Sequence, residues 1–559
     1  MKLFTFTVIA YFLATIISAA QLPQFQWANQ FGGNSYNSIG RSITVDALGN
    51  VYTTGQLEGT IDFDPGNGVF NLTSTGGNDI FISKLDRLGN FVWAKSIGGY
   101  GGDIGFSITV DAMNSIYVSG YVNETASPNS PGNFDIFIAK LDGEGNFLWK
   151  KKFNGFSTDG SQSIAVDLRG NVYITGYFGG TVNFDTSSVV HTVTSRGAED
   201  IFILKLDSTG ALVWVKSVGG IEDDYGKSIA VDGIGNVYVT GFFGDKVDFD
   251  PGSGVYSIQS NGFQNIFILK VDSIGNFVWA KKIGAEGHDE GSSISLDLNG
   301  NVIITGYFEN NVDFDPGIEE HYIKANNRSV FILKLDYSGN YRWVKAMNCS
   351  TSSEGWGRSI GVDSKGSIYS TGDLSGTIDF DPDENSNYNL TSVQGNDIFI
   401  SKLDSNGKFV WVVTMGGVGN EVGYSMALHS NGDIYTTGAF DKTVDFDPGT
   451  PVYNLTSPGR SIFVVKLSQP PSTVNEMQEN STDVAIYPNP GNTITTVDFG
   501  TIVSNGRCKL INIMGQAVME HGDMHGSSYP LDISTLAEGL YIVEVWDKGI
   551  VSRIRLVKN

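Results

Sequence analysis

The sequence predicts an all-β protein built from repeated four-stranded sheets and followed by a second, smaller β-domain. Three observations lead to this prediction. A two-part motif recurs seven times, apolar and polar residues alternate within each copy, and the repeats stop after Leu467. A period of this size, filled with short strands, is typical of a stacked or radial repeat architecture.

The repeated motif has two halves, each of which predicts two strands. The first half has the pattern S-I-x-V-D-x-x-G-N-V-Y-x-T-G, occupies Ser42 to Gly55 and recurs from Ser107, Ser163, Ser228, Ser293, Ser359 and Ser425. The second half has the pattern D-I-F-I-x-K-L-D-x-x-G-N-F-x-W-x-K, as in Asp79 to Lys95. It ends in tryptophans spaced 56 to 68 residues apart, namely Trp27, Trp93, Trp149, Trp214, Trp279, Trp343 and Trp411. The alternation has period two and is rich in β-branched and aromatic residues, which indicates strands.

Each copy is therefore expected to contain four antiparallel strands. In the first copy they are Ser42 to Asp46, Val51 to Gly55, Ile80 to Asp86 and Phe91 to Ser96. The sequence D-x-x-G-N joins the first strand to the second and the third to the fourth, and it predicts a short hairpin in which Asp opens the turn and Gly takes a positive φ. Seven such sheets predict a seven-bladed β-propeller over residues 21–468.

The two ends of the repeat region are expected to meet in one blade. Phe25 to Phe31 carries Trp27, the mark of a fourth strand, but no first strand precedes it. The last copy has its first three strands, ending at Ile462 to Leu467, and lacks the tryptophan strand. The N-terminal strand should therefore complete the last blade and close the ring, which leaves no open sheet edge.

The repeated pattern resembles the SBBP family of β-propeller repeats, whose members occur in secreted bacterial proteins. The resemblance implies the seven-bladed fold and implies no activity.

A lysine recurs in the K-L-D segment of every copy, at Lys84, Lys140, Lys205, Lys270, Lys334, Lys402 and Lys466. A catalytic group is needed once, so a sevenfold lysine is predicted to be structural. Its stem would cover the neighbouring blade and its ammonium would pair with an aspartate.

The first twenty residues predict a secretory signal peptide. They combine Lys2, an apolar run from Leu3 to Ile17 and small residues up to Ala20. The run is too short for a spanning helix, so no transmembrane segment is expected in the mature chain.

The formal charge of −24 argues against nucleic acid or an anionic membrane surface as a partner. Cys349 and Cys508 fall in different domains, so no disulfide framework is expected.

The chain after the repeats is expected to form a linker, residues 469–483, and a small domain, residues 484–559. The linker is rich in Pro, Ser, Asn and Glu. The domain carries four short sequence motifs. They are Tyr487-Pro488-Asn489-Pro490, Met514-Gly515-Gln516, the run Ile533 to Gly539 before Leu540-Tyr541-Ile542-Val543, and basic Arg553, Arg555 and Lys558. Together they resemble the C-terminal sorting domain of the type IX (Por) secretion system of Bacteroidetes. The resemblance implies a small β-sandwich, an interaction with the secretion machinery and delivery to the outer cell surface or the medium. The alternative is an accessory β-sandwich with a binding role.

The loops between blades and between the second and third strands vary from copy to copy, and their face is the predicted functional surface. The loops between blades carry the acids Asp103, Asp159, Glu222, Asp223, Asp224, Glu286, Asp289, Glu290, Glu354 and Glu421, beside Tyr100, Tyr225, Trp356 and Tyr424. An aromatic ring beside carboxylates can stack on a sugar or hold a cation. The predicted ligand-binding residues are Asp223, Asp224, Glu286, Asp289, Glu290, Trp356 and Tyr225. The alternative is a solvated rim with aromatic residues tucked between blades.

A D-F-D-P-G segment, with Asp383 in place of the glycine in the sixth copy, follows the second strand in five copies and supplies candidate metal ligands. They are Asp62 and Asp64, Asp248 and Asp250, Asp313 and Asp315, Asp379 and Asp381, and Asp445 and Asp447. In an extended chain the two carboxylates share a side, so they could converge on calcium. The alternative is a phenylalanine packed under a Pro-Gly turn.

No motif supplies a nucleophile together with its base. The expected function is therefore a non-catalytic binding or adhesion module for a glycan or a protein at the cell surface. The alternatives are a carbohydrate-active enzyme that uses acids of the variable face, and a structural surface component.

Overall fold

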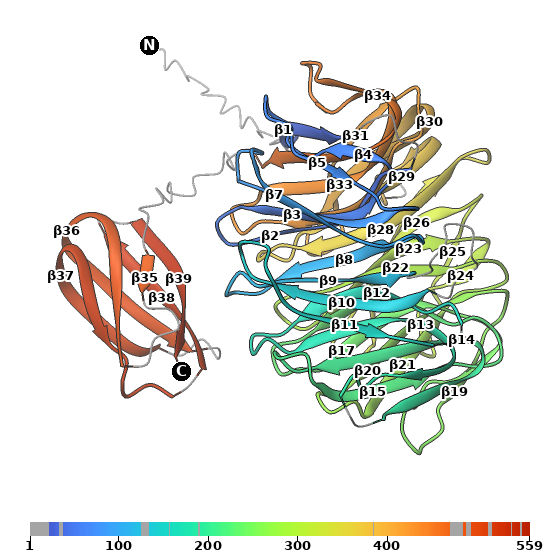
Figure 1. The fold of residues 1–559 in the computed structure, drawn as a ribbon, viewed down its shortest axis with the longest axis horizontal. Helices are drawn as coiled ribbons and strands as arrows, with labels where there is room; N and C mark the ends of the chain where they lie inside the picture. Colours follow the sequence, from blue (N-terminus) through green and yellow to red (C-terminus); the bar gives the residue numbers. More distant parts are fainter. Residues whose placement is uncertain are drawn as a thin grey trace, which may run out of the picture. The chain divides into compact units, whose positions relative to one another are not determined.

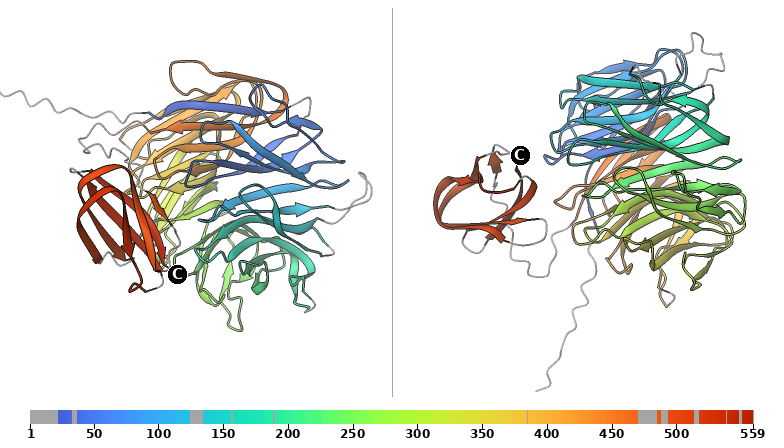
Figure 2. Two further views of the ribbon diagram at one scale, coloured as in Figure 1. Left: turned by 60° about the vertical axis from the view of Figure 1, so that its left-hand side comes forward. Right: turned by 90° about the horizontal axis from the view of Figure 1, so that it is seen from below.

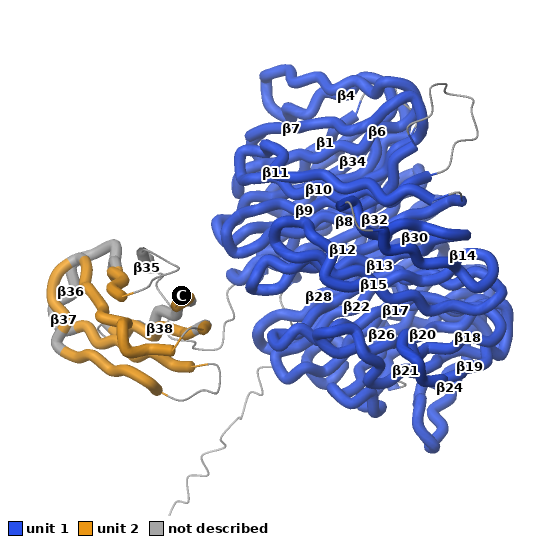
Figure 3. The backbone as a smooth tube through the Cα atoms, turned by 60° about the horizontal axis from the view of Figure 1, so that its bottom comes forward, with its two compact units in different colours: residues 1–470 blue, residues 471–559 orange. Residues whose placement is uncertain are grey.

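The computed structural model describes residues 22–32, 37–123, 134–155, 157–187, 190–383, 385–469, 485–487, 493–512, 517–537, 539–547 and 550–558. Every helix or strand element within these ranges is a β-strand, which confirms the all-β prediction. The chain divides into two compact units, Met1–Pro470 and Pro471–Asn559 (Figure 3). The predicted signal peptide and nearly all of the predicted linker lie outside the described residues. No helix in the described part of the chain has the length and apolar character needed to cross a membrane.

Four-stranded antiparallel sheets repeat along the first unit. The first copy has the order β2 (Ile39–Val45), β3 (Val51–Leu57), β6 (Asp79–Leu85), β7 (Phe91–Ile97). The next three are β8 (Ile104–Val110), β9 (Ile116–Val122), β10 (Asp135–Leu141), β11 (Phe147–Phe153); then β12 (Gly160–Val166), β13 (Val172–Asn183), β14 (Thr192–Leu206), β15 (Leu212–Val218); then β16 (Tyr225–Val231), β17 (Val237–Phe243), β20 (Asn265–Val271), β21 (Phe277–Ile283).

The remaining copies repeat this order and are linked into one larger sheet by short pairings of β27 with β29 and of β31 with β33. They are β22 (Glu290–Leu296), β23 (Val302–Phe308), β26 (Ser329–Leu335), β27 (Tyr341–Cys349); then β28 (Glu354–Val362), β29 (Ile368–Asp379), β30 (Asn389–Leu403), β31 (Phe409–Gly417); then β32 (Val422–Leu428), β33 (Ile434–Asp445), β34 (Asn454–Ser468). Short two-stranded arms stand between the second and third strands, formed by β4 (Thr60–Asp62) with β5 (Asn71–Thr73), β18 (Lys246–Asp248) with β19 (Ser257–Gln259), and β24 (Asn311–Asp313) with β25 (Tyr322–Lys324).

The D-x-x-G-N hairpins form because one aspartate organises each turn. In the first turn, Asp46 Oδ1 accepts the backbone N–H groups of Leu48 and Asn50, both at 2.9 Å. Gly49 takes a φ of 84°, which explains the glycine of the motif. The same arrangement recurs at Asp86, with Gly89 at 85°.

The N-terminal strand pairs with the last strand of the repeat region. Strand β1 (Gln24–Phe31) is antiparallel to β34, with Trp27 opposite Lys466 and Phe31 opposite Ile462 (Figure 1). Residues more than 400 positions apart in the sequence therefore share one sheet.

The first strands of the seven copies are joined by a cycle of hydrogen bonds. In each copy the isoleucine or methionine after the motif serine donates its backbone N–H to the serine Oγ of the preceding copy, at 3.2 or 3.3 Å. The bonds run from Ile108 to Ser42, Ile164 to Ser107, Ile229 to Ser163, Ile294 to Ser228, Ile360 to Ser293, Met426 to Ser359 and Ile43 to Ser425. The last bond returns to the first copy, so the seven strands are linked without a break.

In four copies the repeated lysine and tryptophan both donate to one backbone carbonyl of the following copy. Lys205 Nζ and Trp214 Nε1 both donate to the Ser273 carbonyl of the following copy, at 3.1 and 3.2 Å. The lysine ammonium also lies 5.0 Å from the centre of the Tyr173 ring. A pairing with aspartate, as the sequence predicts, occurs at Lys334 with Asp297 and at Lys466 with Asp433.

The described residues of the second unit contain five strands, β35 (Ala485–Tyr487), β36 (Ile494–Asn512), β37 (Ala517–Asp532), β38 (Gly539–Asp547) and β39 (Ile550–Lys558). They form a single hydrogen-bonded sheet in the order β35-β36-β38-β39, with β37 also on β36. Figure 2 shows these strands in red. The long β36–β37 pair has several register breaks, and the β-sandwich expected for this domain stays a prediction. Its buried core includes Val497, Leu510, Val543 and Leu556.

Candidate ligand-binding site

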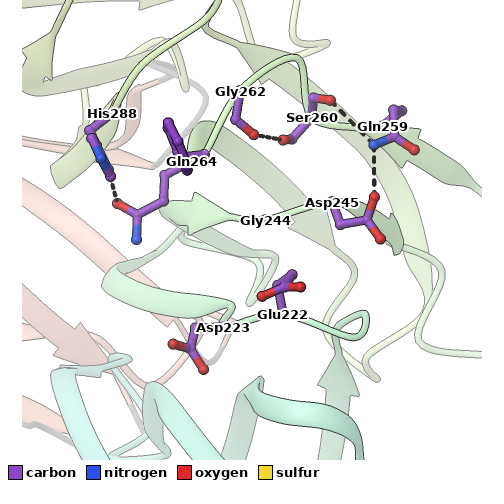
Figure 4. Close-up of a pocket in the computed structure, with 10 residues that line it drawn as sticks. Glu222, Asp223, Gly244, Asp245, Gln259, Ser260, Gly262, Gln264 and His288 are labelled. Atoms are coloured by element: carbon purple, nitrogen blue, oxygen red, sulfur yellow. Dashed lines mark hydrogen bonds between the residues drawn. The ribbon is translucent and has the colours of Figure 1, made fainter.

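A pocket of about 540 Å³ opens among the variable loops around the fourth copy (Figure 4). Four segments supply its walls: the loop between β15 and β16, the turn between β17 and β18, the segment between β19 and β20, and the loop between β21 and β22. The lining residues are Glu222, Asp223, Gly244, Asp245, Gln259, Ser260, Gly262, Phe263, Gln264 and His288.

An exposed aromatic pair marks one side of this pocket. The Phe263 side chain is 76% exposed, and its ring is stacked on His288 with 5.3 Å between ring centres and an interplanar angle of 8°. His288 Nδ1 lies 3.3 Å from Gln264 Oε1. A phenylalanine this exposed gains little from the protein interior, so its ring is available to an apolar ligand face.

Three carboxylates also line the pocket. Glu222 and Asp223 are exposed, and Asp245 is partly exposed. Asp245 has a φ of 48°, a conformation unusual for a residue with a side chain, and its carboxylate accepts from Gln259 Nε2 at 3.0 Å. None of the ten lining residues is a lysine or an arginine. The pocket can therefore accept hydrogen bonds from hydroxyl or ammonium groups while a ring of the ligand lies on Phe263.

Of the seven predicted ligand-binding residues, only Asp223 lines this pocket. Tyr225 is stacked on Tyr177 and donates to Glu199 Oε2 at 2.7 Å. Glu290 pairs with Lys227 at 3.5 Å, and Glu286 is exposed. Trp356 is partly buried beneath the Arg328 guanidinium. The structure does not bring these side chains together.

The prediction that Asp224 and Asp289 belong to an exposed acidic rim is wrong, because neither side chain lies at the surface. Both are fully buried. Asp224 accepts the backbone N–H of Gly220 with one oxygen and that of Gly244 with the other, at 2.7 and 3.0 Å. Asp289 holds Ala285 and Glu309 in the same way. Three further acids of the predicted rim are also fully buried, namely Asp103, Asp159 and Glu421.

Burial raises the pKa of the acids that accept these loop N–H groups. It raises the pKa of Asp224 to about 8, with a smaller contribution from the nearby charge of Asp200, and it raises the pKa of Asp289 to about 7. It also raises the pKa of Glu421 to about 8 and that of Asp159 to about 7. These shifts belong to groups that hold loops together and do not line the pocket.

The candidate calcium ligands of the D-F-D-P-G segments are engaged by their own backbone. Asp248 Oδ1 accepts the N–H groups of Asp250 and Tyr256, at 3.2 and 2.8 Å, and Asp250 Oδ1 accepts that of Gly252. Phe249 is fully buried against Phe267. The same pattern recurs in the other four segments, with first aspartates Asp62, Asp313, Asp379 and Asp445 and second aspartates Asp64, Asp315, Asp381 and Asp447. Among the described residues, no group of three or more acidic, histidine or cysteine side chains is arranged to hold a metal ion.

Sequence reasoning missed most of the pocket, although one signal was available. Phe263 occupies a position at which other copies have a small residue, such as Gly77, Ala198 and Gly395. A bulky aromatic residue at a position occupied elsewhere by glycine or alanine marks this loop as different.

These features define a protein of repeated four-stranded β-sheets joined to a separate small β-domain. Residues 26–56 and 213–241 match the beta-propeller repeat family SBBP, and residues 485–559 match the secretion system C-terminal sorting domain. Both resemblances seen in the sequence are confirmed. A sorting domain of this kind indicates export, to the cell surface or the medium.

Two curated relatives share part of the chain. The uncharacterized WD repeat-containing protein L264 of Acanthamoeba polyphaga mimivirus is 24% identical over 467 residues, which cover 67% of this chain and 33% of that protein. The regulatory protein FlaEY of Caulobacter vibrioides is 26% identical over 111 residues, which cover 20% of this chain and 12% of that protein. The chain thus spans a minor part of either relative. Among solved structures, a chain of the mitotic checkpoint complex has a TM-score of 0.39 at 10% identity, over 83% of this chain and 98% of that one.

Proposed function

We propose that this chain is an exported seven-bladed β-propeller, closed by β1, that binds a ligand outside the cell without catalysis. Two features support the closed ring. The serine hydrogen bonds link seven first strands in a cycle, and β1 pairs with β34. The repeats occupy residues 21–468 in this proposal, and the C-terminal domain directs export through the type IX machinery.

The pocket lined by Phe263 is the proposed ligand site, and a glycan is the ligand class that fits it best. The observation that carries this proposal is the exposed Phe263 ring stacked on His288 beside three carboxylates. The C–H face of a sugar would lie on the ring, and its hydroxyl or amino groups would donate to Glu222, Asp223 and Asp245.

A binding role accounts for this pocket better than an enzymatic one. General acid and base catalysis needs two groups in different environments that both reach the substrate. The acids whose pKa is raised toward neutral pH, Asp224 and Asp289, are buried and hold backbone N–H groups. The pocket acids Glu222 and Asp223 share one exposed environment.

A glycan array probed with the purified full chain tests this proposal. Binding to a defined set of sugars is expected, and Phe263→Ala should weaken it by at least about fivefold because ring stacking contributes about 1 kcal/mol. Replacing Glu222 and Asp223 by Gln and Asn should weaken it further.

The matched control is on the neighbouring arm, where Ile318 is fully exposed and is followed by the exposed acid Glu319. Ile318→Ala with Glu319→Gln should leave binding unchanged. An array without any sugar bound, or equal binding by the Phe263 variant, would contradict the glycan proposal.

A further inference from the structure

The first strands carry a stack of cationic and aromatic side chains at one motif position. The residue immediately before the motif serine is Arg41 in β2, Phe106 in β8, Arg358 in β28 and Tyr424 in β32. The guanidinium carbon of Arg41 lies 5.4 Å from the centre of the Phe106 ring and 4.9 Å from that of Tyr424. The guanidinium carbon of Arg358 lies 5.1 Å from the same Tyr424 ring. The order Phe106, Arg41, Tyr424, Arg358 therefore runs across four consecutive first strands.

Of the two arginines in this stack, only Arg358 forms an ion pair with a carboxylate among the described residues. Arg358 is paired with the buried carboxylate of Asp373, which also accepts from Asn396 Nδ2 at 2.9 Å. Arg41 has one side-chain hydrogen bond, from Nη2 to the neutral Gln56 Oε1 at 3.2 Å. In the part of the chain that the structure describes, no carboxylate forms an ion pair with Arg41, and its Nε is buried without a hydrogen-bond partner.

A third arginine adds to this positive charge. The Nε of Arg460, in β34, is likewise buried without a partner among the described residues. Burial lowers the pKa of the Arg41 guanidinium, and the positive charges of Arg358 and Arg460 lower it further. Burial raises the pKa of the neighbouring Tyr121, so this side chain supplies no counter-charge at neutral pH. A buried cation without a counter-charge is unfavourable, so an anion arriving here would be bound strongly.

We propose that Arg41 binds the oxyanion of an acidic sugar, a carboxylate or a sulfate group. A guanidinium offers N–H donors in a fixed fork that suits both groups. The partly exposed Phe106 ring gives the sugar an apolar face beside the cation. This site shares no residue with the acidic pocket, so it would serve a ligand of opposite charge.

Calorimetric titration of the full chain with glucuronate, glucose 6-sulfate and glucose tests the proposal. Wild type is expected to bind one or both of the acidic sugars, and which of them binds identifies the oxyanion. Arg41→Gln should weaken binding of the acidic sugar by at least about tenfold, because hydrogen bonds to charged groups are the strong ones, and it should leave any binding of glucose unchanged. The control is Arg87→Gln, which removes the same charge from an exposed turn and should leave the affinity unchanged.

One further variant and one further measurement complete the test. Phe263→Ala should leave binding of the acidic sugar unchanged, which separates this site from the proposed glycan pocket. Without ligand, Arg41→Gln should melt no lower than wild type, because it removes an uncompensated cation. An equal loss of glucose binding in Arg41→Gln, unchanged affinity of that variant for the acidic sugars, no binding of them by wild type, or a large loss of ligand-free stability would each overturn the proposal.

Discussion

Asp200 and Asn265 occupy the same position, at the start of the third strand, in consecutive copies of the repeat. Asp200 accepts the backbone N–H of Arg196 with one oxygen, while its Oδ1 is buried without a partner among the described residues. Asn265 accepts from Asn261 in the same way, but its Nδ2 donates to the Ala285 carbonyl at 2.9 Å and lies 3.4 Å from Asp289 Oδ2. The fourth copy thus places an amide where the third places a second buried carboxylate.

This comparison predicts that Asp200→Asn stabilises the protein. The new Nδ2 would take the place of the unpartnered Oδ1, donate to the carbonyl of the adjoining loop and relieve the repulsion between Asp200 and Asp224. A gain of about 1 to 2 kcal/mol in the free energy of unfolding at pH 8 is expected, measured by chemical denaturation. The reciprocal variant Asn265→Asp should lose a similar amount. Destabilisation by Asp200→Asn at pH 8 would contradict the interpretation.

The same carboxyl pair predicts how stability depends on pH. Burial raises the pKa of Asp200 to about 6 and that of Asp224 to about 8, well above the values of an unfolded chain near 4. Between about pH 4 and pH 8 the folded state keeps protons that the unfolded state has released, so stability falls as the pH rises through this window. Asp200→Asn should flatten the part of this decline between about pH 4 and pH 6, as measured by unfolding at a series of pH values.

At the scale of elements, the D-F-D-P-G segments show that a recurrent aspartate can have a structural role, which is to accept backbone N–H groups of its own turn. Each first aspartate accepts two backbone N–H groups with the same oxygen, as Asp248 does. In the third copy Asn183 occupies this position, and its Oδ1 accepts the N–H groups of Asp185 and His191. Phe184 beside it is fully buried, like Phe249. An uncharged amide therefore supports the same arm, so the arm needs an acceptor oxygen and no negative charge.

Asp248→Asn is accordingly expected to change stability by less than about 0.5 kcal/mol, whereas Asp248→Ala should lose about 1 to 2 kcal/mol through two lost hydrogen bonds. Thermal unfolding with calcium and with a chelator measures both effects. The melting temperature of wild type should be the same in both conditions. A calcium-dependent increase that Asp248→Asn abolishes would restore the metal interpretation of these segments.

The limits of prediction from the sequence lie at the same scale. Strands, hairpins and the structural role of the K-L-D lysine follow from seven internal copies, because a local pattern repeated in sequence imposes the same backbone each time. The loops gave no such information. Asp223 and Asp224 are adjacent and chemically equal, yet one is exposed and the other fully buried. Which of them faces solvent depends on how the loop packs against the next copy, and a single copy of the loop cannot reveal this.

At the scale of the whole first unit, no repeat is complete alone. Each core cluster combines side chains of neighbouring copies, as Tyr173 of the third copy does with Val237 and Phe267 of the fourth. Strand β1 joins two such clusters. Its Phe31 is packed with Phe63 and Phe81 of the first copy, and its Ala28 is packed with residues of the sixth and seventh. Stability is then a sum of interfaces between neighbours, and the interface between the last copy and the first depends on a strand supplied from the other end of the chain.

Deleting residues 22–32 should therefore open the proposed ring. The loss of Phe31 and of the whole β1–β34 ladder is expected to lower the melting temperature by at least about 5 °C. It should also expose β34 as an edge that pairs with other molecules. Scanning calorimetry measures the first effect, and light scattering with size-exclusion chromatography measures the second.

A rearranged chain separates the role of the strand from its position in the sequence. Residues 25–31 would be moved to follow Leu467 through a copy of the turn Asp272–Asn276, as the third and fourth strands are joined in the other copies. This chain has the same strand at the same place in the sheet, so it should regain the wild-type melting temperature and remain monomeric. If the deletion variant alone is already monomeric and melts as wild type does, β1 does not close the ring.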